Sequence, residues 1–135
     1  MSASRNLLLQ AIRDLQSRNH ILKIMRSRCR SCAMCVILDK QQRQLQSLEW
    51  EGRQLAIQRG LEPPDFPKRT RFPSVVRSCG SDPRLAQEWT RRNRESLAWY
   101  RRELHRCQRV DPVSILCQKS MDFCIRAIAQ TEPFL

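Results

Sequence analysis

The sequence predicts an all-α fold: a four-helix bundle built from two antiparallel hairpins that one long crossover joins. Apolar residues recur at three- and four-residue spacing in four stretches, as in helices buried on one side. A proline-rich stretch without any period separates the first two from the last two. The chain has 135 residues, the size of one domain, so we expect a single bundle over 1–135. The expected helices span about 4–26, 31–59, 83–108 and 112–130, with the crossover at 60–82.

Two apolar stripes of different phase predict the first hairpin. Continuing the first stripe past Leu22 leads to polar positions such as Lys40, whereas the second stripe is rotated by about a third of a turn. The phase break falls at 26–31, inside the basic segment RSRCRSCAMC, and Gly60 is well placed to cap the second helix. We therefore expect a tight turn between antiparallel helices there.

The second hairpin is predicted by two helix starts of the same chemistry. Asp82-Pro83 and Asp111-Pro112 each place a capping carboxylate before a proline at the first helical position. The segment 60–82 contains four prolines, and a connection this long suits a crossover along the bundle, the connectivity of ferritin-like bundles. Four apolar residues would pack the crossover onto the helices: Phe66, Phe72, Val75 and Val76.

The polar residues on the inner stripes are amides: Asn19, Gln41 and Asn93. Ferritin-like di-metal sites instead take inward carboxylates from all four helices. Amides bind transition metals weakly, but they bond to one another and fix helix register. We therefore expect a buried polar layer, in which Asn19 and Gln41 could meet across the first hairpin, and neither an oxidase nor an iron store.

Two runs resemble a family of uncharacterised bacterial ferritin-like bundles related to stress-induced proteins. They are AIQRGLEPPDFP, at the end of the second expected helix, and DPRLAQEWTRRNRESLAWYRREL, after the crossover. In that family the third helix bears a Gly-Glu pair ahead of a Leu-x-x-Tyr element. Leu97 and Tyr100 match this last element, but Asn93 stands where the glutamate is expected. The resemblance covers roughly half of the chain; it implies a bundle fold, and the departure at Asn93 argues against an enzyme.

Three of the seven cysteines stand three residues apart, at Cys29, Cys32 and Cys35. Thiolates at this spacing can bind a soft metal, and the neighbouring arginines would lower their pKa. A structural zinc site needs a fourth ligand, and neither histidine has a ligand-like partner spacing. Two interpretations stay open: a metal site for Cu(I) or Zn, serving binding, storage or sensing, or ordinary thiols and no cofactor.

The 25 basic and 13 acidic residues give a net charge of +12, which favours anionic partners. The other interpretation is that the arginines only solvate helix faces. Carboxylates or phosphates could bind to an arginine-rich face, and a tryptophan beside it could anchor the contact. The candidate residues are Arg26, Arg28 and Arg30 at the corner, Arg91, Arg94 and Arg101 as an outward ridge, and Trp99.

The remaining sequence features narrow the classes of function that we expect. No apolar run reaches the ~20 residues of a membrane span, and the start MSASRNLLLQAIRDL contains no secretory block, so we expect a cytoplasmic protein. No serine–histidine–aspartate order or glycine-rich phosphate loop is readable. We expect a non-enzymatic adaptor or stress-associated protein that binds an acidic protein or nucleic acid, with self-assembly through Trp99 and the crossover as a further possibility.

Overall fold

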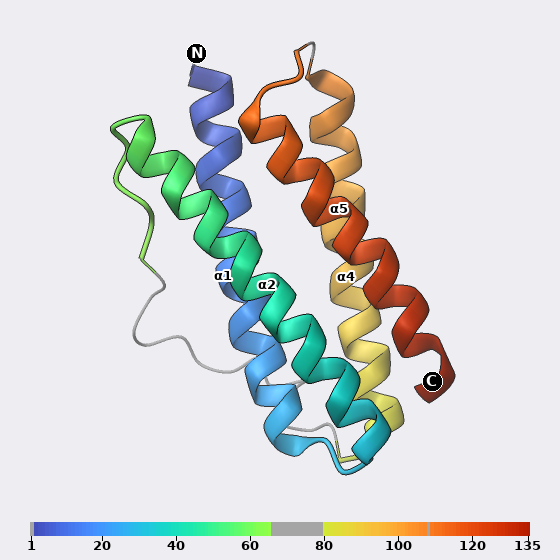
Figure 1. Cartoon of the computed structure of the whole chain (residues 1–135). Coiled ribbons are helices and arrows are strands. Elements are labelled where there is room, and N and C mark those ends of the chain that lie inside the picture. The colour runs from blue at the N-terminus through green and yellow to red at the C-terminus, as the bar shows by residue number, and fades with distance from the viewer. Residues whose placement is uncertain (1, 66–79, 108) are drawn as a thin grey trace.

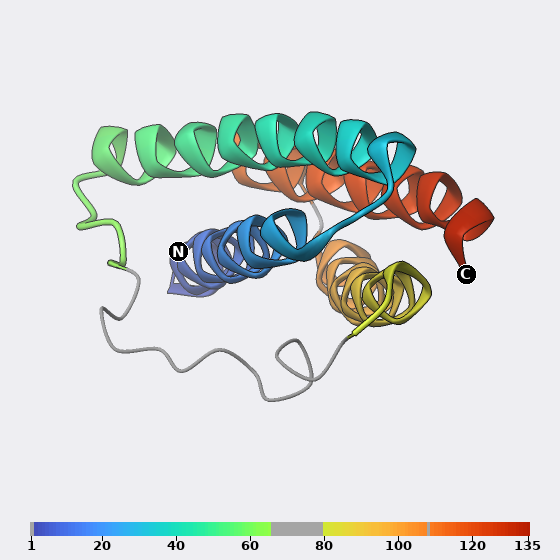
Figure 2. The ribbon, with the colours of Figure 1, turned by 90° about the horizontal axis from the view of Figure 1, so that it is seen from below.

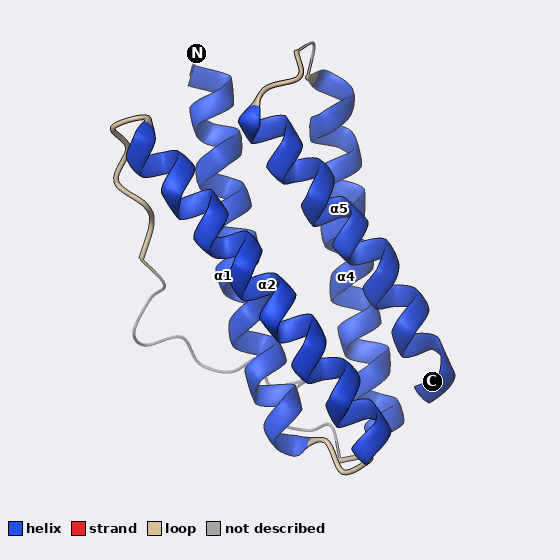
Figure 3. Cartoon of the chain, viewed as in Figure 1, coloured by secondary structure: helices blue, strands red, loops and turns tan. Residues whose placement is uncertain are grey.

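The computed structural model describes residues 2–65, 80–107 and 109–135, which form four long helices, one 3-10 turn and no strand (Figures 1 and 3). The predicted four-helix fold is confirmed, and each long helix ends within one turn of its predicted bounds. The packing residues expected in the crossover, Phe66, Phe72, Val75 and Val76, lie outside the described residues. The elements are α1 Ser2–Arg28, α2 Cys32–Gln58, α4 Asp82–Arg106, α5 Pro112–Thr131 and η1 Glu132–Phe134.

The helices form two antiparallel hairpins, α1 with α2 and α4 with α5. Seen from below in Figure 2, α2 and α5 make one layer, and α1 and α4 make the other. The closest packing lies within each hairpin and then between α2 and α5. In Figure 1, α2 ends and α4 begins at opposite ends of the bundle. None of the described helices is long and apolar enough to cross a membrane.

The end of α2 is fixed by a glycine, as predicted. Gly60 has a φ of 70°, a left-handed conformation that L side chains rarely adopt. Its N–H donates to the carbonyl of Ile57 at 3.0 Å, and the N–H of Leu61 donates to the carbonyl of Ala56 at 2.8 Å. These two bonds make a Schellman motif, which satisfies the last carbonyls of the helix and turns the chain away from it.

The predicted cap at Asp111 is confirmed. Its carboxylate accepts the N–H of Ser114 at 2.8 Å, and the Ser114 hydroxyl accepts the N–H of Asp111 at 2.9 Å. Pro112 occupies the first turn, where a missing N–H does no harm. This reciprocal pair is a capping box, so residues within one turn determine where α5 begins.

The same prediction is wrong at Asp82. The N-cap of α4 is Ser81, whose side chain accepts the N–H of Arg84. The Asp82 carboxylate instead accepts the main-chain N–H of Arg30 at 3.0 Å and of Ser31 at 2.7 Å. The connection between α1 and α2 offers these two unpaired donors, and it lies beside the start of α4. Asp82 therefore ties the first hairpin to the second.

The core runs along the bundle between the two layers. A buried glycine lets three helices approach closely, because a Cβ atom at Gly52 would lie 3.0 Å from Ile12 Cγ1 and 3.2 Å from Leu116 Cδ2. The largest fully buried side chains include Trp89, Tyr100, Phe123, Leu8, Ile12, Leu15, Leu22, Met25, Met34, Leu38 and Leu45.

Candidate functional site

The arginine ridge predicted on the third long helix lies on the outer face of α4, where Arg91, Arg94 and Arg101 are exposed. Arg91 is held by two carboxylates of its own helix, Glu88 at 2.5 Å and Glu95. Arg94 and Arg101 make no ion pair with any residue that the structure describes. The ridge therefore contains one neutralised guanidinium and two that are available to a partner.

A hollow of about 510 Å³ lies along this ridge. Thr90 in its wall is only 3% exposed, and its hydroxyl has no hydrogen-bond partner among the described residues. Apolar surface comes from Ala98 and from Leu135, which is 52% exposed, while Arg91 and Arg94 provide charge. The hollow combines apolar surface with cations, as a binding site for a protein segment does.

The corner arginines are engaged to different degrees. The guanidinium of Arg26 lies 2.6 Å from the Asp39 carboxylate, so a carboxylate already neutralises it. Arg28 and Arg30 are exposed, and the N–H of Arg30 donates to Asp82. This last bond places the corner beside the first turn of α4.

The two tryptophans nearest the outer faces differ in exposure. Trp99 is half-buried and packs edge-on against Tyr100, with 4.8 Å between ring centroids. Trp50 on α2 is 65% exposed. The anchor expected at Trp99 is therefore partly used by the core. Trp50 could have been found from its phase, because it lies opposite the apolar stripe of α2.

Gln41 is buried, as expected, but it bonds to the second hairpin. The Trp89 indole N–H donates to Gln41 Oε1 at 2.7 Å, and Gln41 Nε2 donates to Gln130 Oε1 at 2.9 Å. The expected contact with Asn19 is wrong, because Asn19 is half-buried and donates to Glu49 at 3.1 Å. Gln41 faces α4 and α5 rather than α1, which puts these two amides out of reach.

The centre of the bundle contains a buried ion pair that the sequence did not predict. Arg18 is 2% exposed, and its guanidinium donates to Asp14 at 2.8 Å and to Asn93 Oδ1 at 3.1 Å. It also donates to the sulfur of Cys124 at 3.1 Å. Asn93 is thus buried as expected, with a cation as its partner. The available signal was the i, i+4 spacing of Asp14 and Arg18, which favours an ion pair on one helix face.

Two hydroxyl groups complete this centre. Ser96 and Tyr100 each donate to the Asp14 carboxylate at 2.6 Å. Burial, and then the charge of Asp14, raises the pKa of Tyr100 well above its ordinary value. Burial lowers the pKa of Arg18, but the interactions with Asp14, Cys124 and Tyr100 together outweigh that effect, and the net pKa is raised. The group keeps one cation and one anion paired in the interior, which fixes the positions of α1, α4 and α5.

The three closely spaced cysteines lie at the corner and differ in exposure. Cys29 and Cys35 are half-buried, and Cys32 is exposed. Among the described residues, no three histidine, cysteine or acidic side chains gather as metal ligands do. The expected lowering of thiol pKa is wrong for Cys29: burial and a hydrogen bond with Cys35 raise its pKa to about 12. Metal binding here stays a prediction.

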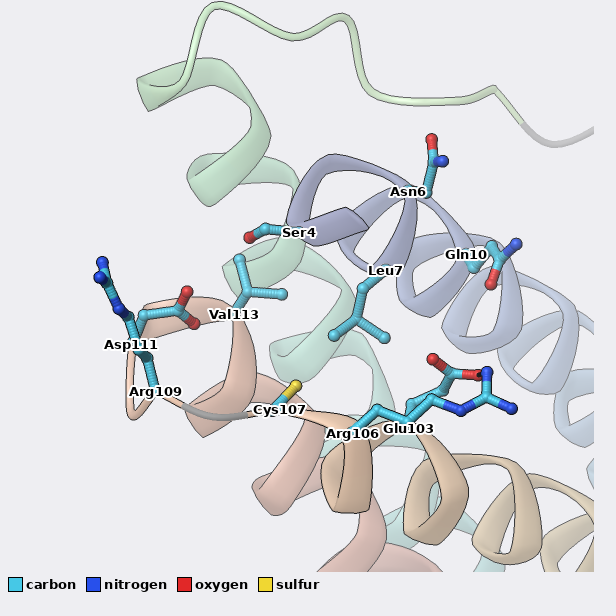
Figure 4. Close-up of a pocket in the computed structure, with 10 residues that line it drawn as sticks. All are labelled: Ser4, Asn6, Leu7, Gln10, Glu103, Arg106, Cys107, Arg109, Asp111 and Val113. Carbon is cyan, nitrogen blue, oxygen red and sulfur yellow. Dashed lines mark ion pairs between the residues drawn. The ribbon is translucent and has the colours of Figure 1, made fainter. Parts of the chain in front are cut away.

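The opposite end of the bundle contains a larger hollow, of about 670 Å³ (Figure 4). It lies between the first turns of α1 and the connection from α4 to α5, with Leu7 and Val113 as apolar walls. Glu103 pairs with Arg106 at 3.6 Å. Burial, followed by nearby carboxylates, raises the pKa of the Cys107 thiol in this hollow. The thiol therefore stays protonated at neutral pH and is a weak nucleophile.

Comparison with known proteins gives no relative of this chain: no family model, curated protein or solved structure matches it. The resemblance to ferritin-like bundles therefore rests on the two sequence runs alone.

Proposed function

We propose that this protein is a non-enzymatic binding protein of the cytoplasm whose α4 ridge receives an acidic segment of a partner protein. One observation carries the proposal: Arg94 and Arg101 are exposed on one face of α4 and have no ion-pair partner among the described residues. They are two helical turns apart, ~10.5 Å along the axis. The planar guanidinium suits bidentate pairing with carboxylates.

A protein segment suits this surface better than a nucleic acid does. Glu95, which is 64% exposed and pairs with Arg91, interrupts the row of arginines, so separated carboxylates suit the ridge better than an evenly charged phosphate backbone does. The hollow beside the ridge also offers apolar surface at Ala98 and Leu135. A partner that alternates acidic and apolar side chains can satisfy both features, because charge pairing and apolar burial then reinforce each other.

The interior supports binding rather than catalysis. The inner polar positions hold Arg18, Gln41 and Asn93, and each is hydrogen-bonded within the fold. The one carboxylate at the centre, Asp14, is paired with Arg18 and accepts the Ser96 and Tyr100 hydroxyls, so these contacts serve the packing of the helices. The hydrogen bonds of these side chains fix how the helices pack. We therefore place the binding site on the outer surface.

The test is a fluorescence-anisotropy titration of the full chain at several salt concentrations. Two labelled probes of equal charge are used: a peptide of glutamate and leucine, and a single-stranded DNA. The variant Arg94→Glu/Arg101→Glu is compared with Lys40→Glu/Arg43→Glu on α2, which makes the same charge change at exposed positions. We expect the parent to prefer the peptide and the α4 variant to lose roughly tenfold or more in affinity, against about twofold for the α2 variant.

Equal losses in the two variants would contradict the proposal, because net charge alone would then explain binding. A parent that prefers the DNA probe would replace the acidic protein with a nucleic acid as the partner class. Affinity for the peptide should also fall steeply as salt rises, since the attraction is between exposed charges.

A further inference from the structure

The corner between α1 and α2 contains two thiols that contact its main chain and a third that is exposed. The Cys35 thiol donates to the main-chain carbonyl of Cys29 at 3.5 Å. The Cys29 thiol donates to the carbonyl of Ser31, also at 3.5 Å. Both sulfurs therefore contact main-chain carbonyls of the same short connection. Cys32 is the exposed member of the trio and has no such contact among the described residues.

The connection between these two thiols is held in place from both sides. The N–H of Cys29 donates to the carbonyl of Met25 at 3.0 Å, which extends the hydrogen bonding of α1. The Asp82 carboxylate accepts the N–H groups of Arg30 and Ser31. The backbone between the two thiols is therefore already fixed. Little conformational entropy is lost when the two sulfurs move into bonding distance.

We infer that Cys29 and Cys35 form a reversible redox pair, which closes to an intramolecular disulfide when the protein meets a small-molecule disulfide such as oxidised glutathione. The site is independent of the α4 ridge and of its partner. In a reducing compartment such a disulfide is transient, so the pair would respond to oxidising conditions rather than serve as a permanent cross-link.

The reaction balances as two thiol–disulfide exchanges. The Cys35 thiolate, its proton released to solvent, attacks one sulfur of the small disulfide, forms a mixed disulfide and expels one glutathione thiolate. Cys29 then loses its proton to solvent, attacks the sulfur of Cys35 and expels the second thiolate. The two released protons protonate the two leaving thiolates. The protein is oxidised by two electrons, and one oxidised glutathione becomes two molecules of reduced glutathione.

The surroundings favour this order of attack. Burial and the hydrogen bond with Cys35 raise the pKa of Cys29 to about 12, so Cys29 is a neutral thiol at pH 7 and a poor first nucleophile. The guanidinium of Arg26, whose charge acts on both thiols, is also paired with Asp39.

The test maps the bond in the unmodified full chain. Reduced protein is incubated with oxidised glutathione, free thiols are blocked by alkylation, and a tryptic digest is analysed by mass spectrometry. Trypsin cuts after Arg28 and Arg30, so Cys29 is released in the dipeptide CR and Cys35 in the peptide SCAMCVILDK. We expect CR linked to SCAMCVILDK through Cys35, an intact mass lower by about 2 Da, and full reversal by dithiothreitol.

Variants separate the roles of the three thiols. Cys32→Ser should close as the parent does, whereas Cys35→Ser should leave Cys29 without an intramolecular partner. Fragmentation that places the bond at Cys32, or alkylation of both Cys29 and Cys35 after oxidation, would overturn the inference. So would a stable glutathione adduct on Cys35, which would show that Cys29 cannot reach it. The mapping on the parent decides the question even if a variant folds poorly.

Discussion

Arginine and carboxylate meet in two regions of this molecule under opposite conditions. In the centre, Arg18 is 2% exposed and bonds to Asp14 across one turn of α1. On the ridge, Arg91 is half-exposed and pairs with Glu88 and Glu95. The cation of the central pair is shielded from water and has hydrogen-bond partners on three helices, whereas the cation on the ridge is open to water, which competes above all for its contact with Glu95. The same pair of residue types therefore fixes the fold in one region and leaves charge available for binding in the other.

The largest expected effect comes from removing the anion of the central pair. Asp14→Ala leaves the Arg18 cation buried and deprives the Ser96 and Tyr100 hydroxyls of their acceptor. We expect the free energy of unfolding to fall by ~3–5 kcal/mol, measured by urea denaturation. The matched control is Asp39→Ala, which breaks the exposed pair with Arg26 and should lose less than ~1 kcal/mol.

Arg18→Met sharpens the same comparison. It removes the buried cation while Asp14 keeps its two hydroxyl partners, so the loss should be smaller than for Asp14→Ala, ~1–3 kcal/mol. Equal losses for Asp14→Ala and Asp39→Ala would show that burial does not distinguish the two regions.

An intermediate effect is expected at Glu88, where the ridge meets the interior. Its side chain is 8% exposed and lies 2.5 Å from Arg91 and 2.9 Å from Arg92. Glu88→Gln should lower the free energy of unfolding at pH 7 by ~1–2 kcal/mol. Glu95→Gln, at a position that is 64% exposed, should change it by less than ~0.5 kcal/mol.

The effect at Glu88 should also depend on pH in a defined direction. The hydrogen bond from Arg91, with the charges of Arg91 and Arg92, lowers the pKa of Glu88 below its ordinary value of 4.5. The stabilisation is therefore complete above pH 4.5 and is lost as the pH falls through the folded-state pKa. Denaturation of the parent and of Glu88→Gln should converge at acid pH. A difference that stayed constant would mean that packing, not charge, is responsible.

The smallest effect is expected at Arg94 and Arg101, which make no ion pair with the residues that the structure describes. Arg94→Glu/Arg101→Glu changes only exposed side chains, so thermal unfolding should show a change in stability within ~0.5 kcal/mol even where partner binding is lost. A loss of more than ~2 kcal/mol would show that these arginines support the fold and would remove them as a dedicated binding surface.

What the sequence by itself determined is local. The spacing of apolar residues predicted four helices to within a turn, Gly60 predicted the end of α2, and Asp111 predicted the start of α5. Each of these features depends on residues within one or two turns, because hydrogen bonding in a helix and at its caps connects near neighbours.

Only the tertiary structure decided which polar side chains would meet. Asp82 has the same neighbour as Asp111, a following proline, yet it bonds to Arg30 and Ser31 in the first hairpin. Gln41 bonds to Trp89 and Gln130 rather than to Asn19, and Arg18 occupies the centre. A long polar side chain takes whichever unpaired donor or acceptor stands opposite it, and packing places that partner. The periodicity of one helix carries no information about the facing residues of another.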